Sequence, residues 1–153
     1  MAVKKSEVTI RPLVSSDISP ILGFWWSSFI ANKEMVASQL GGRRDLSLIA
    51  SFEGHLVGFI LARIGYLGIP IKEVCVIHAI AIEPKYQGQG IGTLLINTLK
   101  STCESRGVST MRAFVAEDDH KLMNYFERLG FKRSNIINME LHSGGGAPDK
   151  PTG

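Results

Sequence analysis

Cysteine is scarce in this sequence, and no long apolar run is present. The two cysteines, Cys75 and Cys103, lie in apolar segments without CxxC spacing, so they predict neither a disulfide framework nor a zinc site. The longest apolar stretch, residues 74–82, is too short to span a bilayer. Residues 1–8 contain no apolar segment that would serve as a signal peptide. We therefore expect a soluble, cytoplasmic protein with reduced thiols, no metal and no membrane partner.

An excess of charge of one sign is also missing. The 17 Lys and Arg residues against 14 Asp and Glu give a formal net charge of +3, and the basic residues are scattered. Because nucleic-acid binding usually shows as a clustered basic stripe, the sequence predicts no nucleic-acid partner. The length of 153 residues fits one compact domain. We expect that domain to cover residues 1–142, followed by a disordered Gly- and Pro-rich tail over 143–153.

Strand and helix periodicities alternate along the chain. Strand patterns fall at six places: residues 7–13, 46–52, 56–64, 73–82, 110–116 and 131–141. Helical spacing starts at Ile18 and includes Trp25, recurs from Ile91 to about Arg106, and returns between about residue 120 and Gly130. Residues 65–70 read as a loop. This order predicts an α/β (α+β) fold with a central mixed β-sheet flanked by helices.

The most informative segment is a glycine-rich turn between a strand and a helix. Glycines at 88, 90 and 92 let a ligand approach the backbone closely. The helix that follows offers unpaired N–H groups and the positive end of its dipole to an anion. The spacing G-x-G-x-G differs from the dinucleotide fingerprint, and no lysine stands in the Walker position. The segment therefore predicts a pyrophosphate-binding turn that belongs to neither of those two classes.

Gln87, Gly90 and Gly92 match the motif Q/R-x-x-G-x-G/A of the GNAT acetyltransferase superfamily, which this segment resembles. Residues 10–17, with their Arg-Pro and Asp, are similar to the family's opening strand and helix start. Residues 125–131, Tyr-Phe-Glu-Arg-Leu-Gly-Phe, are similar to its late motif. The resemblance implies a GNAT-like fold, acetyl-CoA as co-substrate, and transfer of an acetyl group to a primary amine by direct attack.

The resemblance also implies where the co-substrate would lie. Its pyrophosphate would bind the backbone amides of Gln87, Gly88, Gln89, Gly90, Ile91 and Gly92, with Thr93 near by. Its pantetheine would pair, as an added strand, with the main chain of Ile80, Ala81 and Ile82. The last helix would flank the thioester through Asp119 and Phe126.

Two positions in the late motif depart from the family pattern. Phe126 stands where the family usually has a tyrosine that acts as general acid, and phenylalanine donates no proton. Asp119 stands where asparagine is frequent. Tyr125 is adjacent to Phe126 but about 100° away around a helix, which makes it a poor substitute. A thiolate with a pKa near 8.5 can also leave without a dedicated acid.

A second chemical requirement is a base, because an ammonium ion has no lone pair for the attack. His78 is the first candidate, since histidine is largely neutral at pH 7 and an apolar strand tolerates it poorly without a reason. Strict alternation would place it on one face with Val76 and Ile80. The strand resembles that of the aralkylamine acetyltransferases, which implies proton removal by His78; the alternative is a structural, hydrogen-bonded histidine. Glu73 is the second candidate base.

Two function classes stay open at this point. One is the N-acetyltransferase, whose acceptor would be a small-molecule amine, such as a polyamine, an arylalkylamine or an aminoglycoside, or a peptide or protein amine. The other is a module that binds CoA or acyl-CoA as a sensor without turnover. The resemblance further implies a possible homodimer.

Overall fold

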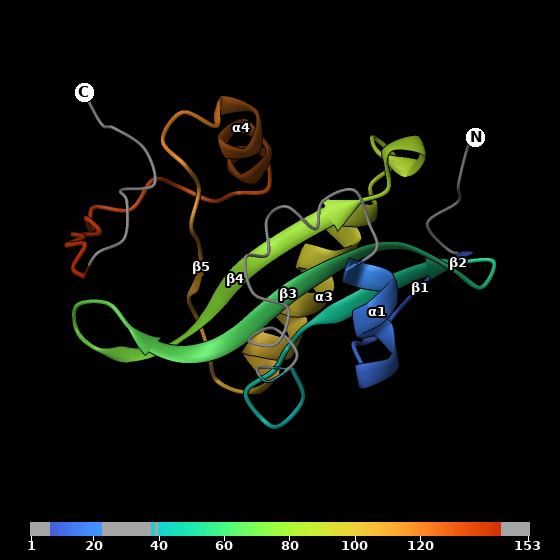
Figure 1. Cartoon of the computed structure of the whole chain (residues 1–153), viewed down its shortest axis with the longest axis horizontal. Helices are drawn as coiled ribbons and strands as arrows, with labels where there is room; N and C mark the ends of the chain where they lie inside the picture. The colour runs from blue at the N-terminus through green and yellow to red at the C-terminus, as the bar shows by residue number, and fades with distance from the viewer. Residues whose placement is uncertain (1–6, 23–37, 39, 145–153) are drawn as a thin grey trace.

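The computed structural model describes residues 7–22, 38 and 40–144. Its centre is one five-stranded sheet in the order β1-β2-β3-β4-β5, which Figure 1 shows. The antiparallel neighbours are β1 (Val8–Pro12), β2 (Leu48–Phe52), β3 (His55–Leu67) and β4 (Lys72–Ile82). The fifth strand, β5 (Met111–Ala113), pairs parallel to β4. The predicted mixed sheet is confirmed.

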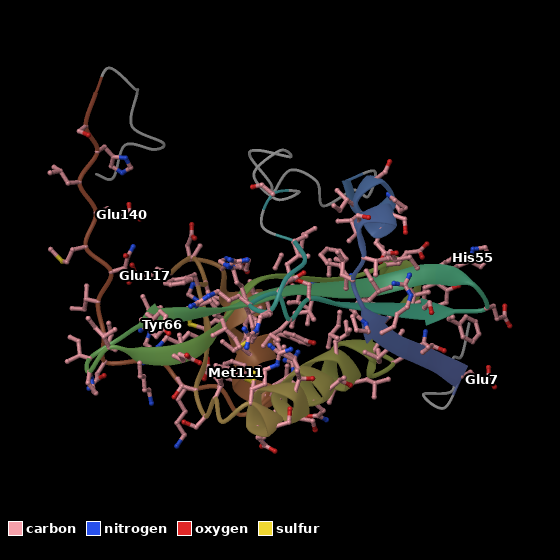
Figure 2. All side chains as sticks on the ribbon, turned by 90° about the horizontal axis from the view of Figure 1, so that it is seen from below. Glu7, His55, Tyr66, Met111, Glu117 and Glu140 are labelled. Atoms are coloured by element: carbon pink, nitrogen blue, oxygen red, sulfur yellow. The ribbon has the colours of Figure 1, made fainter. Side chains whose placement is uncertain are left out.

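Helices cover both faces of this sheet (Figures 1 and 2). On one face lies α1 (Ile18–Leu22), which continues the 3-10 turn η2 (Ser15–Asp17). On the other face lies α3 (Ile91–Ser105), which follows β4 and the 3-10 turn η4 (Pro84–Tyr86). The last helix, α4 (His120–Arg128), follows β5. Trp25, predicted on the apolar side of the first helix, and most of the predicted tail lie outside the described residues.

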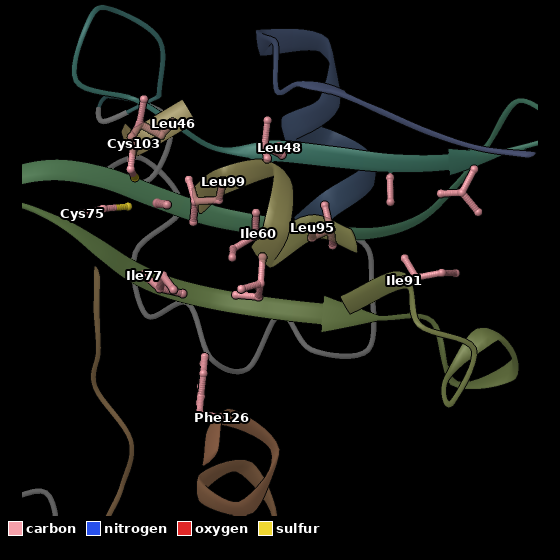
Figure 3. Packing of buried hydrophobic residues seen from close by; sticks show 14 of the residues in the cluster. Leu46, Leu48, Ile60, Cys75, Ile77, Ile91, Leu95, Leu99, Cys103 and Phe126 are labelled. Carbon is pink, nitrogen blue, oxygen red and sulfur yellow. The ribbon is translucent and has the colours of Figure 1, made fainter. Parts of the chain in front are cut away.

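The face of α3 that packs on the sheet holds the larger of two cores (Figure 3). Its residues Ile91, Leu95, Leu99 and Cys103 recur at spacings of four and are all buried. Each buried Leu or Ile stabilises the fold by roughly 1.5–3 kcal/mol relative to an exposed one. Cys103 meets Cys75 of β4 in this core, and both cysteines are free thiols. This packing holds the N-terminus of α3 against the end of β4.

A bidentate ion pair joins β1 to the start of α1. Arg11 donates to the two carboxylate oxygens of Asp17 at 2.7 and 2.8 Å, and the Val14 N–H donates to the same carboxylate at 2.8 Å. Asp17 is buried, so these bonds replace the water that its charge loses. The pair of residues that the sequence singled out near the N-terminus therefore has a structural role.

Replacing Asp17 with asparagine is expected to lower the free energy of unfolding by about 1.5–3 kcal/mol, because hydrogen bonds to a charged group are lost. Arg11 hydrogen-bonds the carboxylate and holds the pKa of Asp17 below its ordinary value. The stabilisation that the Asp17 carboxylate provides is thus fully present above its pKa in the unfolded chain, near 3.9, and is lost as pH falls through its pKa in the folded protein. Thermal melts at pH 7 and pH 3 check this, with Asp118→Asn on an exposed carboxylate as control. If the melting temperatures of wild type and Asp17→Asn differ as much at pH 3 as at pH 7, the prediction is contradicted.

Two predicted boundaries are wrong, and strand pairing explains both. The predicted loop over 65–70 is strand up to Leu67, because Tyr66 and Leu67 pair with Glu73 and Lys72 of β4. The strand predicted over 110–116 contains only three residues in β5. It ends at Ala113, where its ladder with β4 also ends.

The strand predicted over 131–141 is also wrong: the segment has no regular secondary structure. Ile137, Met139 and Leu141 alternate with polar residues, which is the pattern of a strand, yet they are 80, 86 and 92% exposed. A strand needs the backbone of a partner. At this edge of the sheet β5 offers three residues, and no other strand in the described ranges pairs with the segment.

Candidate active site

Only three residues of β4, Cys75 to Ile77, are paired with β5. The parallel ladder ends with the pair Ile77 and Ala113, after which the chain leaves β5. Among the residues that the structure describes, residues 78–82 of β4 thus have a partner strand on the β3 side alone. The N–H and C=O groups of such an edge can pair with an extended ligand as though it were another strand. The predicted pantetheine partners, Ile80, Ala81 and Ile82, lie in this stretch.

A β-bulge stands where the free edge begins. Leu61 of β3 pairs with Ala79, and the next residue, Ala62, pairs with Ile77. His78 is therefore the extra residue of β4, opposite no single partner in β3. A bulge bends and twists its strand, which separates the two halves of β4 at this residue.

Because of the bulge, side chains do not alternate strictly along β4, so the predicted face of His78 is wrong. Strict alternation would put it with Val76 and Ile80. Ile80 packs against the larger core, which contains the buried face of α3 (the α3-side core). Ala79 and Ala81 pack against a smaller core that contains Ile21 of α1 (the α1-side core). His78 itself is exposed rather than part of either core. Partial burial of the ring, together with the positive charge of Arg63, lowers the pKa of His78. The imidazole is therefore neutral at pH 7 and able to accept a proton.

The glycine turn begins directly after β4. The Gln87 side chain donates to the Ile82 carbonyl at 3.0 Å, and this bond links the turn to the end of β4. Gly88 and Gly90 have φ of 77° and 86°, the left-handed region that glycine adopts without steric cost. Buried Tyr86 fixes the base of the turn through an edge contact with Phe52, at a centroid distance of 6.0 Å. The turn is thus built by backbone conformation and anchored in the core.

The first turn of α3 opens onto this loop. Its first backbone bond runs from the Leu94 N–H to the Gly90 carbonyl at 3.0 Å, so the N–H groups of Ile91, Gly92 and Thr93 have no acceptor within the helix. No side chain caps the helix start, and its first turn contains no acidic residue. This end of α3 offers several donors and a positive dipole to an anion.

Gly92 has a different reason to be glycine from its two neighbours in the motif. It is buried within α3 at an ordinary helical conformation. A Cβ built on it would lie 1.9 Å from the hydroxyl oxygen of Tyr125 and 3.1 Å from its Cζ. Tyr125 of α4 therefore occupies the space of a side chain at the first turn of α3, and glycine at 92 makes that contact possible.

Gly92→Ala is expected to destabilise the protein by about 1–3 kcal/mol, the usual effect of overpacking. Without the clash, alanine in a helix would instead be favoured over glycine by roughly 1 kcal/mol. Tyr125→Phe removes the nearest atom, so the double variant should recover much of the loss. Melting temperatures of the wild type, both single variants and the double variant form a double-mutant cycle, which measures how strongly residues 92 and 125 are coupled in stability. Additive effects would show that the contact is absent in solution.

The two α4 residues that were predicted at the site, Asp119 and Phe126, make contacts that stabilise the fold. Asp119 caps the helix, since its side chain accepts from the Leu122 N–H at 3.1 Å. Phe126 is buried in the α3-side core and makes edge contacts with Tyr125 and Phe131 at 5.8 and 5.0 Å. Tyr125, set aside in the sequence on angular grounds, is the α4 residue whose polar atom reaches the glycine turn.

Glu73 lies away from the other candidate residues. It pairs with Tyr66 near the start of β4, and the Tyr66 hydroxyl donates to it at 3.2 Å. At the usual rise, on the order of 30 Å of strand separates it from Ile82. It lines a cavity of about 620 Å³ together with Arg43, Arg44, Ile64 and Arg106. The structure thus places His78 at the start of the free edge of β4 that leads to the glycine turn, and Glu73 near the opposite end of the strand.

No group of three or more His, Cys, Asp or Glu side chains in the described ranges is placed to hold a metal ion. None of the helices in that part of the chain is long and apolar enough to cross a membrane.

Comparison with known proteins gives consistent matches. The model of the acetyltransferase (GNAT) family matches residues 18–131. An uncharacterised N-acetyltransferase of Methanocaldococcus jannaschii is 29% identical over 94 residues, which cover 61% of this chain. The chain spans only 42% of the length of that relative.

Among solved structures, an aminoglycoside acetyltransferase from an uncultured soil metagenomic sample has a TM-score of 0.73 at 15% identity, covering 92% of this chain and 99% of its own. AAC(6')-Iy in complex with the bisubstrate analogue CoA-S-monomethyl-acetylneamine scores 0.72 at 17%, covering 90% and 99%. A ribosomal-protein-alanine N-acetyltransferase from Brucella melitensis biovar Abortus 2308 scores 0.71 at 19%, covering 89% and 99%. These likenesses show a shared fold, and with the family match over most of the chain they establish that this protein belongs to the acetyltransferase (GNAT) family.

Proposed function

We propose that the chain is an acetyl-CoA-dependent N-acetyltransferase that acetylates a primary amine by direct attack. The observation that carries the proposal is the position of the His78 bulge, at the point where β4 loses its β5 partner and runs as a free edge to the glycine turn. An extended pantetheine chain fits such an edge, and a pyrophosphate fits the donors at the start of α3. Membership of the family supports the same co-substrate.

Each residue then has a defined task. The backbone amides from Gln87 to Gly92, with Thr93, bind the pyrophosphate, and the main chain of residues 80–82 aligns the pantetheine. Neutral His78 takes one proton from the ammonium form of the acceptor, directly or through a water. The neutral amine nitrogen then attacks the carbonyl carbon and the C–N bond forms. As the C–S bond breaks, the nitrogen loses a second proton, which the departing thiolate accepts. The products are the amide and CoA as its thiol, and the first proton stays on His78 until it is released to solvent.

The acceptor is a primary amine on a small molecule or on a peptide. The aminoglycoside enzymes and the ribosomal-protein-alanine enzyme among the structural neighbours are named for amines of both kinds. The test is CoA release, followed with a thiol reagent, for acetyl-CoA with a panel of aminoglycosides, arylalkylamines, polyamines and basic peptides. Turnover with one class supports the proposal and names the acceptor. Tight binding of acetyl-CoA with no turnover across the panel would favour the sensor module instead.

A further inference from the structure

The hydroxyl of Tyr125 is a polar atom without a partner in the described part of the chain. Its oxygen is buried from solvent and makes no hydrogen bond there. It lies against the first turn of α3, where a Cβ on Gly92 would be 1.9 Å away. A buried hydroxyl that lacks a partner destabilises the protein, because it has lost its hydrogen bonds to water without replacement. Such an atom needs an explanation, and a ligand at this position would supply one.

This hydroxyl lies against Gly92 in the first turn of α3, and that helix start offers hydrogen-bond donors. The N–H groups of Ile91, Gly92 and Thr93 have no acceptor within the helix, and no side chain caps the helix start. Burial raises the pKa of Tyr125, against a smaller opposite effect from Arg128, so the hydroxyl keeps its proton at neutral pH. A protonated hydroxyl beside a row of free N–H groups completes a set of donors, which suits a ligand with several anionic oxygens.

We propose that the Tyr125 hydroxyl binds the phosphate-bearing part of CoA at the N-terminus of α3. This inference rests on the proposed function, because it places the same co-substrate in the same turn. It gives Tyr125 a task at the phosphate end, whereas the thioester chemistry belongs near His78. Tyr125 is thus a co-substrate-binding residue, and its loss should change KM for acetyl-CoA much more than kcat.

The test removes one oxygen atom with Tyr125→Phe. Titration calorimetry should show CoA binding about tenfold weaker, the usual loss for one hydrogen bond to a charged group. Competition by 4′-phosphopantetheine should weaken similarly, whereas competition by pantetheine, which has no phosphate, should not change. KM for acetyl-CoA should rise by a similar factor and kcat should stay within about twofold. The melting temperature of the free protein should not fall, because the removed hydroxyl had no partner.

Tyr66→Phe is the control, since it removes a tyrosine hydroxyl from β3 beside Glu73, at the end of β4 away from the glycine turn. Figure 2 shows the position of Tyr66. This control variant should leave the CoA affinity, KM for acetyl-CoA and kcat unchanged. Equal CoA affinity of Tyr125→Phe and wild type would overturn the inference while leaving the proposed function intact. A fall in kcat without a change in KM would also overturn it, because Tyr125 would then act at the thioester. Failure of the wild-type protein to bind CoA would overturn the proposed function and this inference together.

Discussion

Replacing His78 with alanine is expected to lower kcat/KM at least about 100-fold, the usual contribution of a positioned general base. The residue stands at the bulge where the free edge of β4 begins, and it is the only histidine of that strand. Its ring is exposed enough to meet an incoming amine. The affinity for CoA should stay unchanged, because no part of the proposed binding turn is altered. Calorimetry and initial rates on the same preparations measure both quantities.

The pH dependence separates a base from a structural histidine. Partial burial and Arg63 lower the pKa of His78 from its ordinary value of 6.5. The wild-type enzyme should therefore keep its base deprotonated through neutral pH and lose kcat/KM only as pH falls through a value below 6.5. His78→Ala should lack this acid limb, while any limb that belongs to the acceptor amine should persist in both enzymes.

His55→Ala provides the control, because His55 is an exposed histidine at the start of β3. Its rates and its pH profile should match the wild type. Partial rescue of His78→Ala by added imidazole would support proton transfer directly. Wild-type rates for His78→Ala between pH 6 and 9 would exclude the role and leave a water chain as the proton acceptor.

Local patterns were sufficient to predict the glycine turn and its helix. The turn depends on positive φ at Gly88 and Gly90, and glycine spacing reveals this without knowledge of the rest of the chain. The end of α3 is equally local, since Gly107 with φ of 73° follows the last turn and the Val108 N–H returns to the Cys103 carbonyl at 2.9 Å. The order of the described strands and helices up to α4 followed from the same kind of signal.

Features that depend on a distant partner were predicted poorly. The bulge at His78 is produced by the pairing of β4 with β3, and alternation within β4 contains no sign of it. Tyr125 and Phe126 were placed at the correct angle to each other, but which of them faces the glycine turn depends on how α4 packs against α3. The alternating segment after Phe131 has the composition of a strand and lacks a partner to pair with.

Gly90→Val is expected to weaken CoA binding at least about 100-fold, because the valine side chain would fill the space that the turn leaves for the pyrophosphate. The structure adds a second effect to this prediction. Gly90 is the N-cap of α3 with φ of 86°, where a β-branched residue is strained. The strain alone costs roughly 1–2 kcal/mol, so the variant should also melt at a lower temperature. Lost binding in this variant is therefore ambiguous without a control for backbone strain.

Gly107→Val supplies that control at the other end of the same helix. Gly107 has φ of 73° and open space around its missing Cβ, so valine there meets a similar backbone strain and no ligand site. Both variants should lose a similar amount of melting temperature, whereas only Gly90→Val should lose affinity for CoA in calorimetry. Equal losses of affinity in the two variants would show that the effect is one of stability. Full affinity in a folded Gly90→Val protein would mean that the pyrophosphate lies elsewhere, since a turn in contact with it has no room for a branched side chain at its centre.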